Sequence, residues 1–556
     1  MDQQYHAVLT YSAFYPQNDI PEKNVERLDG LNRDVVFNLF CRLKMTLSRS
    51  SERDINNPFI NWFVSKLPDS HGERFRHLVF DGFPKHFLTT PLIVNQILVD
   101  LFQKTETSLE PMYERPDYIA LAVLETIMIY NEHHFRQIGI GEKSDTHDLL
   151  WQIMMMQDMN GANSASFVRT GGMKQAIFID FLEQITGTGY PAFEKAICEM
   201  LGINKLGDVS LLYLALQIEQ DKRIQTSDPL ICIPPEDPIY QTLYNLNLVL
   251  EPGKNDVAFS IFDIMMKPFI RLSNGNLSFT GTHDLSLISE LGWGYFLFKE
   301  GSLSSYIPQF SKSSFQAFFG YYVEKFLLGK VFQSFHQKGY RVIPSDDKKT
   351  PDMTLILNET DIFIIEIKTS TVHYKDWQEQ NLNAFKKYLN DNFISDKKGV
   401  VQLHKCLQHL SDHPEELFEI SIPLKKLKIY PIIIYSEPHA GVVAVNDFII
   451  NNGPELSIEL SSKFKAILPV TMISCDFFLE NSKLLSKNKR LLKDAILRYH
   501  KGTRERKKQW LKVNSTANFS KAMADFDNYS IGFEGIYKED QLAIADQIKA
   551  IFNQTK

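Results

Sequence analysis

Two carboxylates and a lysine are the residues of this 556-residue chain whose types and spacing could do chemistry. Asp352 comes directly before the apolar run 353–358, and Glu366 and Lys368 end the run 361–368. Carboxylate oxygens are hard ligands that suit Mg²⁺, and a nearby ammonium group offsets negative charge that develops on a phosphate. These side chains could therefore hold a divalent metal ion against a phosphodiester.

The run 361–368 is rich in isoleucine, which favours a β-strand that is buried on at least one face. Side chains alternate along a strand, so Glu366 and Lys368 project from one face while Phe363, Ile365 and Ile367 project from the other. Burial of ionisable groups carries a desolvation cost, which a bound metal ion would offset. An ion pair on a half-exposed strand is the alternative interpretation.

The polar residues between the two runs predict a hairpin. A connection with an odd number of residues, such as 358–360, places Asp352 opposite Glu366 and on the same face. A two-residue connection instead places Asp352 opposite Ile367 and facing away, unless a bulge re-aims it. The shared site therefore depends on the length of this loop.

The sequences Pro351-Asp352 and Glu366-Ile367-Lys368 resemble the motif of the PD-(D/E)xK nuclease superfamily, which has the restriction-endonuclease-like fold. The resemblance implies that Asp352 and Glu366 ligate Mg²⁺, for which Mn²⁺ could substitute. It also implies that the backbone carbonyl of Ile367 adds a ligand. Lys368 would then orient or activate the attacking water.

The segment 313–338 predicts an amphipathic helix upstream of this motif, with Ser313 or Ser314 as its N-cap. Its Glu324 resembles the glutamate that the first core helix of many superfamily members directs toward the metal. A solvated helix glutamate is the alternative. Gly320, one turn earlier, would let this helix approach the sheet closely, although glycine costs about 1 kcal/mol inside a helix.

Further strands and helices are predicted on both sides of the motif. The segments 339–344, 429–435 and 467–475 read as strands, and 400–410 reads as a helix. Gln402 on that helix resembles the glutamine that follows the lysine strand in recombination-type and helicase-linked nucleases. A surface glutamine is the other interpretation.

The expected fold is therefore of the mixed α+β class and has three regions. Residues 1–300 form a mainly helical recognition or regulatory region, with helix-like spacing over 88–105, 118–134, 175–186, 192–201 and 209–219 and a subdomain break near 233–238. Residues 310–480 form the restriction-endonuclease-like domain with a central mixed sheet. Residues 481–556 form a basic helical C-terminal region that packs on this domain.

Charge is distributed unevenly along the chain. The formal net charge is -7, yet twelve Lys or Arg stand against two acidic residues between 483 and 512, which gives this window +10 and the remainder -17. Basic runs with aromatic residues bind nucleic acid through counterion release and stacking, and a solvated helix face is the alternative. The expected nucleic-acid contacts are Lys501, Arg504, Arg506, Lys507, Lys508 and Trp510.

Composition excludes several classes of protein. A hydrophobic content of 44% with 12% aromatic residues does not fit a disordered chain. No apolar stretch reaches the ~18 residues of a membrane helix and no export leader is visible, so we expect a cytoplasmic protein without a membrane partner. The five scattered cysteines form no C-x-x-C pattern, which argues against a zinc finger or a disulfide framework.

The sequence and the resemblance together predict a Mg²⁺-dependent endonuclease that hydrolyses phosphodiester bonds, with DNA as the favoured substrate. Two alternatives stay open: a non-catalytic nucleic-acid-binding or assembly protein that keeps the nuclease fold as a scaffold, and an RNase. The helical N-terminal region would recognise a target, a partner protein or a second copy of the chain. Family analogy suggests a bacterial restriction or anti-phage effector, that is, a protein of antiviral defence.

Overall fold

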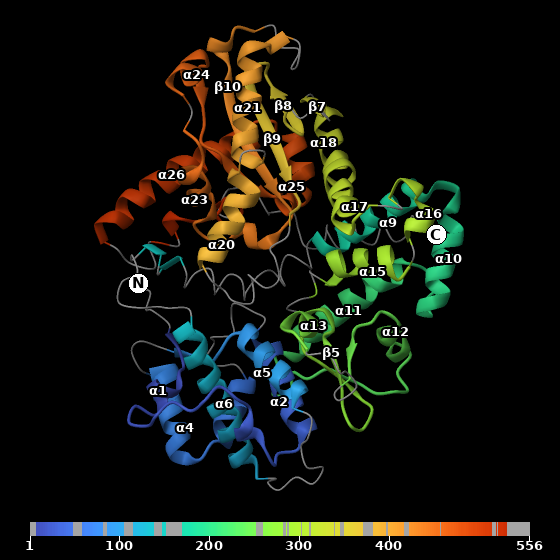
Figure 1. The fold of residues 1–556 in the computed structure, drawn as a ribbon, viewed down its shortest axis with the longest axis vertical. Coiled ribbons are helices and arrows are strands. Elements are labelled where there is room, and N and C mark those ends of the chain that lie inside the picture. The colour runs from blue at the N-terminus through green and yellow to red at the C-terminus, as the bar shows by residue number, and fades with distance from the viewer. Residues whose placement is uncertain are drawn as a thin grey trace. The chain divides into compact units, whose positions relative to one another are not determined.

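The computed structural model divides the chain into two compact units (Figure 1). Unit 1 comprises residues 1–144, 160–175 and 182–308, and unit 2 comprises residues 145–159, 176–181 and 309–556. Residues 233–238 lie inside unit 1, and two short segments of the N-terminal half belong to unit 2. The structure describes residues 7–47, 58–81, 86–104, 115–137, 147–148, 150–151, 170–251, 259–281, 285, 288–301, 303–310, 313–337, 340–344, 350–370, 382–395, 398–415, 422–455, 457–513, 519 and 521–530.

The protein is of the mixed α/β class, as the sequence predicts. The helix-like segments of the N-terminal half form α5 (Pro91–Gln103), α6 (Pro116–Gln137), α9 (Gly172–Thr186), α10 (Tyr190–Leu201) and α11 (Gly207–Arg223). Across the described parts of the chain, no helix combines the length and the apolar character needed to cross a membrane.

Unit 1 also contains short strands. Two of them pair in parallel, and four others form a small mixed sheet in the order β3-β6-β5-β4. Their bounds are β1 (Ala7–Val8), β2 (His86–Phe87), β3 (Cys232–Ile233), β4 (Val249–Leu250), β5 (Phe269–Arg271) and β6 (Leu277–Phe279).

Unit 2 is built around a six-stranded mixed sheet. β7, β8 and β9 are consecutive antiparallel neighbours, and β10 pairs in parallel with β9 on one side and with both β11 and β12 on the other. The bounds are β7 (Arg341–Pro344), β8 (Met353–Leu357), β9 (Asp361–Lys368), β10 (Lys428–Tyr435), β11 (Ala466–Ile467) and β12 (Thr471–Ser474).

The single strand expected over 467–475 is instead two short strands, β11 and β12, which pair with the two halves of β10. Pro469 lies between them, and proline has no N–H to donate to a neighbouring strand. Pro431 of β10, which faces the same gap, also lacks an N–H, so two prolines account for the difference.

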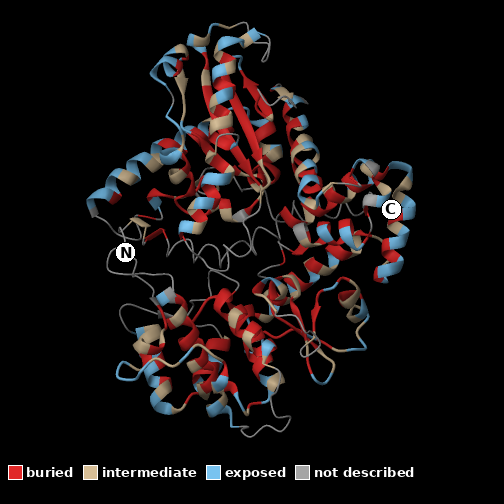
Figure 2. Ribbon diagram, viewed as in Figure 1, coloured by how far each residue is buried: buried red, intermediate tan, exposed pale blue. Residues whose placement is uncertain are grey.

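The middle of the sheet is its most buried part. β9 lies between β8 and β10, and all of its residues except Lys368 are buried, as the red strands of Figure 2 show. An isoleucine-rich strand fits this place because branched side chains pack well on both faces of a covered sheet. Charged groups on β9 are consequently removed from water.

The helix that precedes the sheet runs nearly over the expected range 313–338. It consists of α17 (Phe315–Tyr321), the π-helical segment η8 (Tyr322–Leu327) and α18 (Leu328–Gln337). The Ser314 side chain accepts a hydrogen bond from the N–H of Ala317 at 3.2 Å, which makes Ser314 the N-cap. The sequence did not predict the π-helical segment in the middle.

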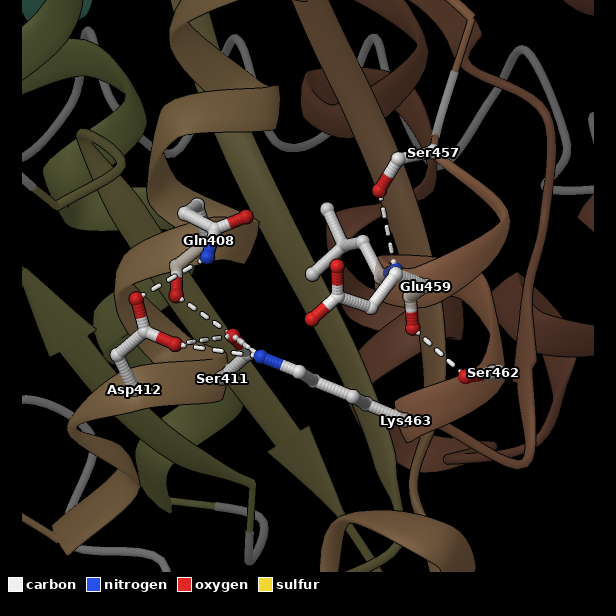
Figure 3. Close-up of polar contacts among 8 residues, drawn as sticks. Gln408, Ser411, Asp412, Ser457, Glu459, Ser462 and Lys463 are labelled. Atoms are coloured by element: carbon white, nitrogen blue, oxygen red, sulfur yellow. Dashed lines mark hydrogen bonds and ion pairs between the residues drawn. The ribbon is translucent and has the colours of Figure 1, made fainter.

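Several further helices cover the sheet of unit 2. α21 (Gly399–Asp412) packs on β9 and β10, α25 (Cys475–Lys487) packs on α18, and α26 (Leu491–Val513) packs on α28 (Phe526–Ser530). The C-terminal end of α21 is tied to α24 (Ile458–Lys463), as Figure 3 shows. The Lys463 ammonium lies 3.2 Å from Ser411 Oγ and 3.4 Å from Asp412 Oδ1, so this end of the covering helix is fixed.

Candidate active site

The loop between β8 and β9 has the odd number of residues that a shared site requires. It consists of Asn358, Glu359 and Thr360, and its first two residues have φ values of 50° and 58°, in the left-handed region. Asparagine tolerates this conformation well, whereas glutamate adopts it at some cost. The loop thus carries local strain at Glu359, and its length of three residues sets the register of the hairpin.

The register of the hairpin places the two acidic residues side by side. Met353 of β8 pairs with Ile365 of β9, so one step further along both strands Asp352 lies opposite Glu366. In an antiparallel pair, opposite residues project from the same face. Asp352 and Glu366 therefore meet where β8 begins and β9 ends.

Asp352 is held directly against the motif strand. Its Oδ2 accepts a hydrogen bond of 2.7 Å from the backbone N–H of Ile367. The N–H of Ser436, which follows β10, donates to the carbonyl of Lys368 at 3.2 Å, so the polar backbone groups of Lys368 face β10. Those of Ile367 face the side of β8, because they alternate along a strand between two neighbours. The Ile367 carbonyl is therefore directed to the side on which Asp352 lies.

Glu366 and Lys368 form a buried ion pair. Lys368 Nζ lies 2.5 Å from Glu366 Oε1, and the two side chains are only 13% and 2% exposed. Among the residues that the structure describes, the other carboxylate oxygen, Glu366 Oε2, is buried and has no hydrogen-bond partner. The ion pair of the alternative interpretation is therefore present, but it lies on a buried strand and not on a half-exposed one, and burial makes such a pair costly to stability.

The two carboxylates share an environment that disfavours their charge. The pKa of Glu366 is raised to about 8, chiefly by burial and next by the Asp352 carboxylate, while the Lys368 ammonium opposes both effects. Burial also raises the pKa of Asp352, against the hydrogen bond from Ile367. Two acidic groups that resist ionisation at one place would both be stabilised as carboxylates by a cation.

Glu324 lies within electrostatic reach of this pair. Its charge raises the pKa of both Asp352 and Glu366, while the charge of Lys325 lowers that of Asp352. The Glu324 side chain is 30% exposed and pairs with Lys325 at 2.7 Å. Glu324 stands in the π-helical turn, where the N–H of Leu328 bonds the carbonyl of Val323 five residues earlier. Such turns often occur at functional sites.

The helix that carries Glu324 approaches the end of β9 closely. A Cβ atom added to Gly320 would lie 3.1 Å from Oγ1 of Thr369, the residue after Lys368. Aromatic packing holds the same helix from the other side, with the rings of Phe178 and Phe181 centred 4.9 and 5.1 Å from that of Tyr322. Glycine at position 320 thus permits the close approach that the sequence predicts.

The donors at this place fit a hard divalent cation. Within the described ranges, no three His, Cys, Asp or Glu side chains meet at the spacing of a metal site. Asp352 and Glu366 are thus a pair of carboxylates and not a cluster of three, and the Ile367 carbonyl is a third oxygen on the same side. The unsatisfied Glu366 Oε2 and an all-oxygen donor set favour Mg²⁺ or Mn²⁺ over softer metals.

Gln402 is not joined to these residues. It lies half-buried on α21, and in the described part of the chain no hydrogen bond links its side chain to Asp352, Glu366 or Lys368. α21 does pack on β9. The structure therefore places Gln402 on the covering helix without a contact to the site.

The expected nucleic-acid contacts divide into two groups on α26. Lys501, Arg504 and Lys508 are exposed. Lys507 instead pairs with Asp447 at 2.5 Å, and the Arg506 guanidinium lies 4.8 Å from the centre of the Tyr529 ring. The second group fastens the helix to its neighbours.

Trp510 does not lie on the exposed face with these cations. It is 5% exposed, and its ring packs against those of Phe519 and His147, with centroids 5.4 and 5.9 Å away. Eleven residues make three helical turns, so Trp510 shares the core-facing side with the buried Tyr499. The sequence predicts that Trp510 stacks on bases. Stacking requires an open ring face, and the fold covers the ring of Trp510.

Two residues near Lys368 were missed by the sequence reasoning. Tyr435 pairs with Lys368 in the β9–β10 ladder, and its hydroxyl donates to Asp527 Oδ2 at 3.0 Å. The N–H of Ser474 donates to the same oxygen at 3.2 Å, so Asp527 links the ends of β10 and β12. The position of Tyr435 at the end of an apolar run was a usable signal, whereas nothing in the local sequence singles out Asp527.

No protein-family model, curated protein or solved structure matches this chain. The functional interpretation therefore rests on the geometry of the site itself.

Proposed function

We propose that this protein is a metal-dependent endonuclease of the PD-(D/E)xK type that hydrolyses the phosphodiester bonds of DNA. The observation that carries the proposal is the meeting of Asp352 and Glu366 across a hairpin, with Lys368 bonded to the second carboxylate. Mg²⁺ is the expected ion, and Mn²⁺ would substitute for it.

The order of the strands supports the same proposal. Three antiparallel strands lead into a parallel pair, and helices precede and follow the strand that carries Glu366 and Lys368. This arrangement is consistent with a restriction-endonuclease-like core over 310–480. The basic helical region that follows belongs to the same compact unit.

Each residue has a role in the proposed reaction. A bound divalent cation supplies positive charge that stabilises the transition state of phosphodiester hydrolysis. Asp352, Glu366 and the Ile367 carbonyl would hold this ion. Lys368 Nζ would orient the attacking water and offset negative charge on the phosphate. Glu324 would adjust the charge of the site from the helix.

The main alternative is a nucleic-acid-binding protein that keeps the fold as a scaffold. A scaffold gains nothing from Glu366, whose burial is costly and whose second oxygen has no hydrogen-bond partner in the described part of the chain. The buried charges therefore favour an enzyme. Family analogy further suggests a cytoplasmic restriction or anti-phage role, in which unit 1 recognises a target, a partner protein or a second copy.

A cleavage assay tests the proposal. Supercoiled plasmid and labelled RNA are incubated with the parent protein in Mg²⁺, in Mn²⁺ and in excess EDTA, beside the Asp352→Ala and Lys368→Ala variants. We expect metal-dependent cleavage of DNA by the parent alone. Cleavage that persists in EDTA, or in both variants at the parental rate, would refute the assignment, and cleavage of RNA alone would identify an RNase.

A further inference from the structure

Two lysines of α26 form ion pairs, and four other cations of this helix are exposed. Lys493 pairs with Asp361 at 2.7 Å and Lys507 pairs with Asp447 at 2.5 Å, so both fasten the helix to the core of the unit. Lys501, Arg504, Lys508 and Lys512 are exposed, and none makes an ion pair with any residue for which the structure gives a position. We call these four residues the basic stripe.

The basic stripe follows one side of the helix. Its members are separated by three, four and four residues, which is the spacing of neighbours on a helical surface, and they extend over about 16 Å. The exposed Glu505 lies beside them but pairs with none of them in the described structure. Duplex DNA carries about one phosphate charge per 1.7 Å of its axis, so several phosphates fit along this length.

Ion pairs at two places hold α26 to other elements of unit 2. Lys493, near its start, bonds Asp361 at the first position of β9. Lys507, near its end, bonds Asp447 of α23 (Val445–Asn452). The stripe therefore occupies the half of the helix that lies away from the start of β9.

Hydrogen bonds of α23 connect this half of α26 to the central sheet. Asn446, next to Asp447, accepts a hydrogen bond from the N–H of Met472 at 2.6 Å. Met472 pairs with Ile433 of β10, which pairs with Glu366 of β9. The ion pair of Lys507 is thus connected through α23, β12 and β10 to the strand that carries Glu366.

The stripe has no aromatic platform. Tyr499 and Trp510, the aromatic residues of α26 other than histidine, are only 3% and 5% exposed. Proteins that hold single strands combine a basic groove with exposed rings on which bases stack. A convex row of cations without rings fits the outer phosphates of a duplex, which position a protein without conveying sequence.

Exposed leucines at the two ends of the stripe raise the question of a membrane surface. Leu497 and Leu511 are 40% and 64% exposed. They are fourteen residues apart with three of the four stripe cations between them, so they form no continuous apolar face of the kind that enters a bilayer. The charges, not the leucines, dominate this side of the helix.

We propose that the basic stripe binds the sugar–phosphate backbone of double-stranded DNA without reading sequence. The choice of DNA as the ligand rests on the proposed function. The choice of these four residues and the preference for a duplex rest on which side chains of α26 are exposed and which form ion pairs.

Binding is measured by fluorescence anisotropy with a labelled 30-base-pair DNA and its single strand, in EDTA and on a Lys368→Ala background, so that catalysis plays no part. The stripe variant carries Lys501→Gln, Arg504→Gln and Lys508→Gln. The control variant carries Lys483→Gln, Lys487→Gln and Lys489→Gln, which removes the same charge from exposed lysines outside α26. Thermal melting checks that both variants fold as the parent does.

We expect the stripe variant to bind the duplex roughly 10- to 100-fold more weakly and the control to stay within about twofold of the parent. Each lost phosphate contact lowers the slope of log K against log salt by about 0.9, so three contacts lower it by roughly 2 to 3. The parent should bind the duplex at least ~10-fold more tightly than the single strand.

Four results would overturn the proposal: equal affinities of stripe and control variants, parental binding of the single strand as tight as of the duplex, no binding of DNA by the parent, or tighter binding of phosphatidylserine vesicles than of duplex. Failure of the proposed nuclease function can be distinguished from failure of the proposed binding surface. A protein that never cleaves DNA in Mg²⁺ but shows stripe-dependent binding loses the enzyme assignment and keeps the binding surface.

Discussion

The carboxylate of Asp352 accepts a hydrogen bond of 2.7 Å from the backbone N–H of Ile367, the residue between Glu366 and Lys368. This bond joins the start of β8 to the end of β9 through a side chain, at the point where the ladder of backbone pairs stops. It aims an acidic group at the motif strand whose own glutamate is buried beside it. The contact thereby brings the two carboxylates together.

Substitutions at Asp352 should separate its structural role from its charge. Asp352→Asn keeps an oxygen that can accept the hydrogen bond from Ile367 but removes the negative charge. We expect it to fold as stably as the parent within about 1 kcal/mol and to cleave DNA roughly 100-fold more slowly. Single-turnover cleavage in Mg²⁺ and urea denaturation measure the two effects, and parental cleavage by Asp352→Asn would remove this residue from the metal site.

The raised pKa of Glu366 predicts a pH-dependent stability in the absence of metal. Its pKa is about 8 in the folded chain and 4.5 without the fold, so the native state holds a proton that the unfolded state releases. Stability should therefore fall as pH rises from about 5 to about 9, by on the order of 4 kcal/mol. Glu366→Gln, which cannot ionise, should lose this dependence.

Urea denaturation in EDTA at pH 5 and pH 9 measures that difference. The exposed Glu505 offers a matched control, since Glu505→Gln removes the same charge from a solvated position. It should follow the parent. If Glu366→Gln shows the same pH dependence as the parent, another group causes it and the environment inferred for Glu366 is wrong.

Gly320 should affect activity through distance alone. A Cβ atom there would meet Thr369 Oγ1 at 3.1 Å, so Gly320→Val should push the helix that carries Glu324 away from β9. We expect cleavage to fall about 10-fold or more while the unfolding free energy changes by about 1 to 3 kcal/mol. Combining Gly320→Ala with Thr369→Ala, which removes the crowded oxygen, should restore activity relative to Gly320→Ala alone.

The strained loop that sets the register offers a separate test. Glu359 has a φ of 58°, where a β-branched side chain is costly and glycine is not. Glu359→Val should destabilise the protein by about 1 to 2 kcal/mol, whereas Glu359→Gly should be neutral or slightly stabilising. Thermal denaturation distinguishes the two, and equal melting temperatures would contradict the left-handed conformation of this residue.

Local patterns in the sequence are sufficient to predict the strand β9 and to place Glu366 and Lys368 on the same face of it. An isoleucine-rich run with alternating side chains determines both the strand and the face on which the charges lie. The loop length decides the position of Asp352, and the sequence narrows this choice to two registers without selecting one. Only the pairing of Met353 with Ile365 selects the register.

Other features depend on distant contacts and were not predictable in this way. The π-helical turn at 322–327 follows no sequence rule, and residues 176–181 join unit 2 although most of the N-terminal half does not. The burial of Trp510 was accessible in principle, because its helical spacing from Tyr499 places both on one side. The basic residues around Trp510 instead predicted an exposed position.

The most direct test of the metal site is a crystal structure of the protein soaked in Mn²⁺, with anomalous diffraction recorded at the manganese edge. We predict an anomalous peak between the carboxylates of Asp352 and Glu366, with the Ile367 carbonyl oxygen as a further ligand, and its loss in Asp352→Ala crystals. A well-ordered site without such a peak, or a peak that survives the Asp352→Ala substitution, would contradict the central claim.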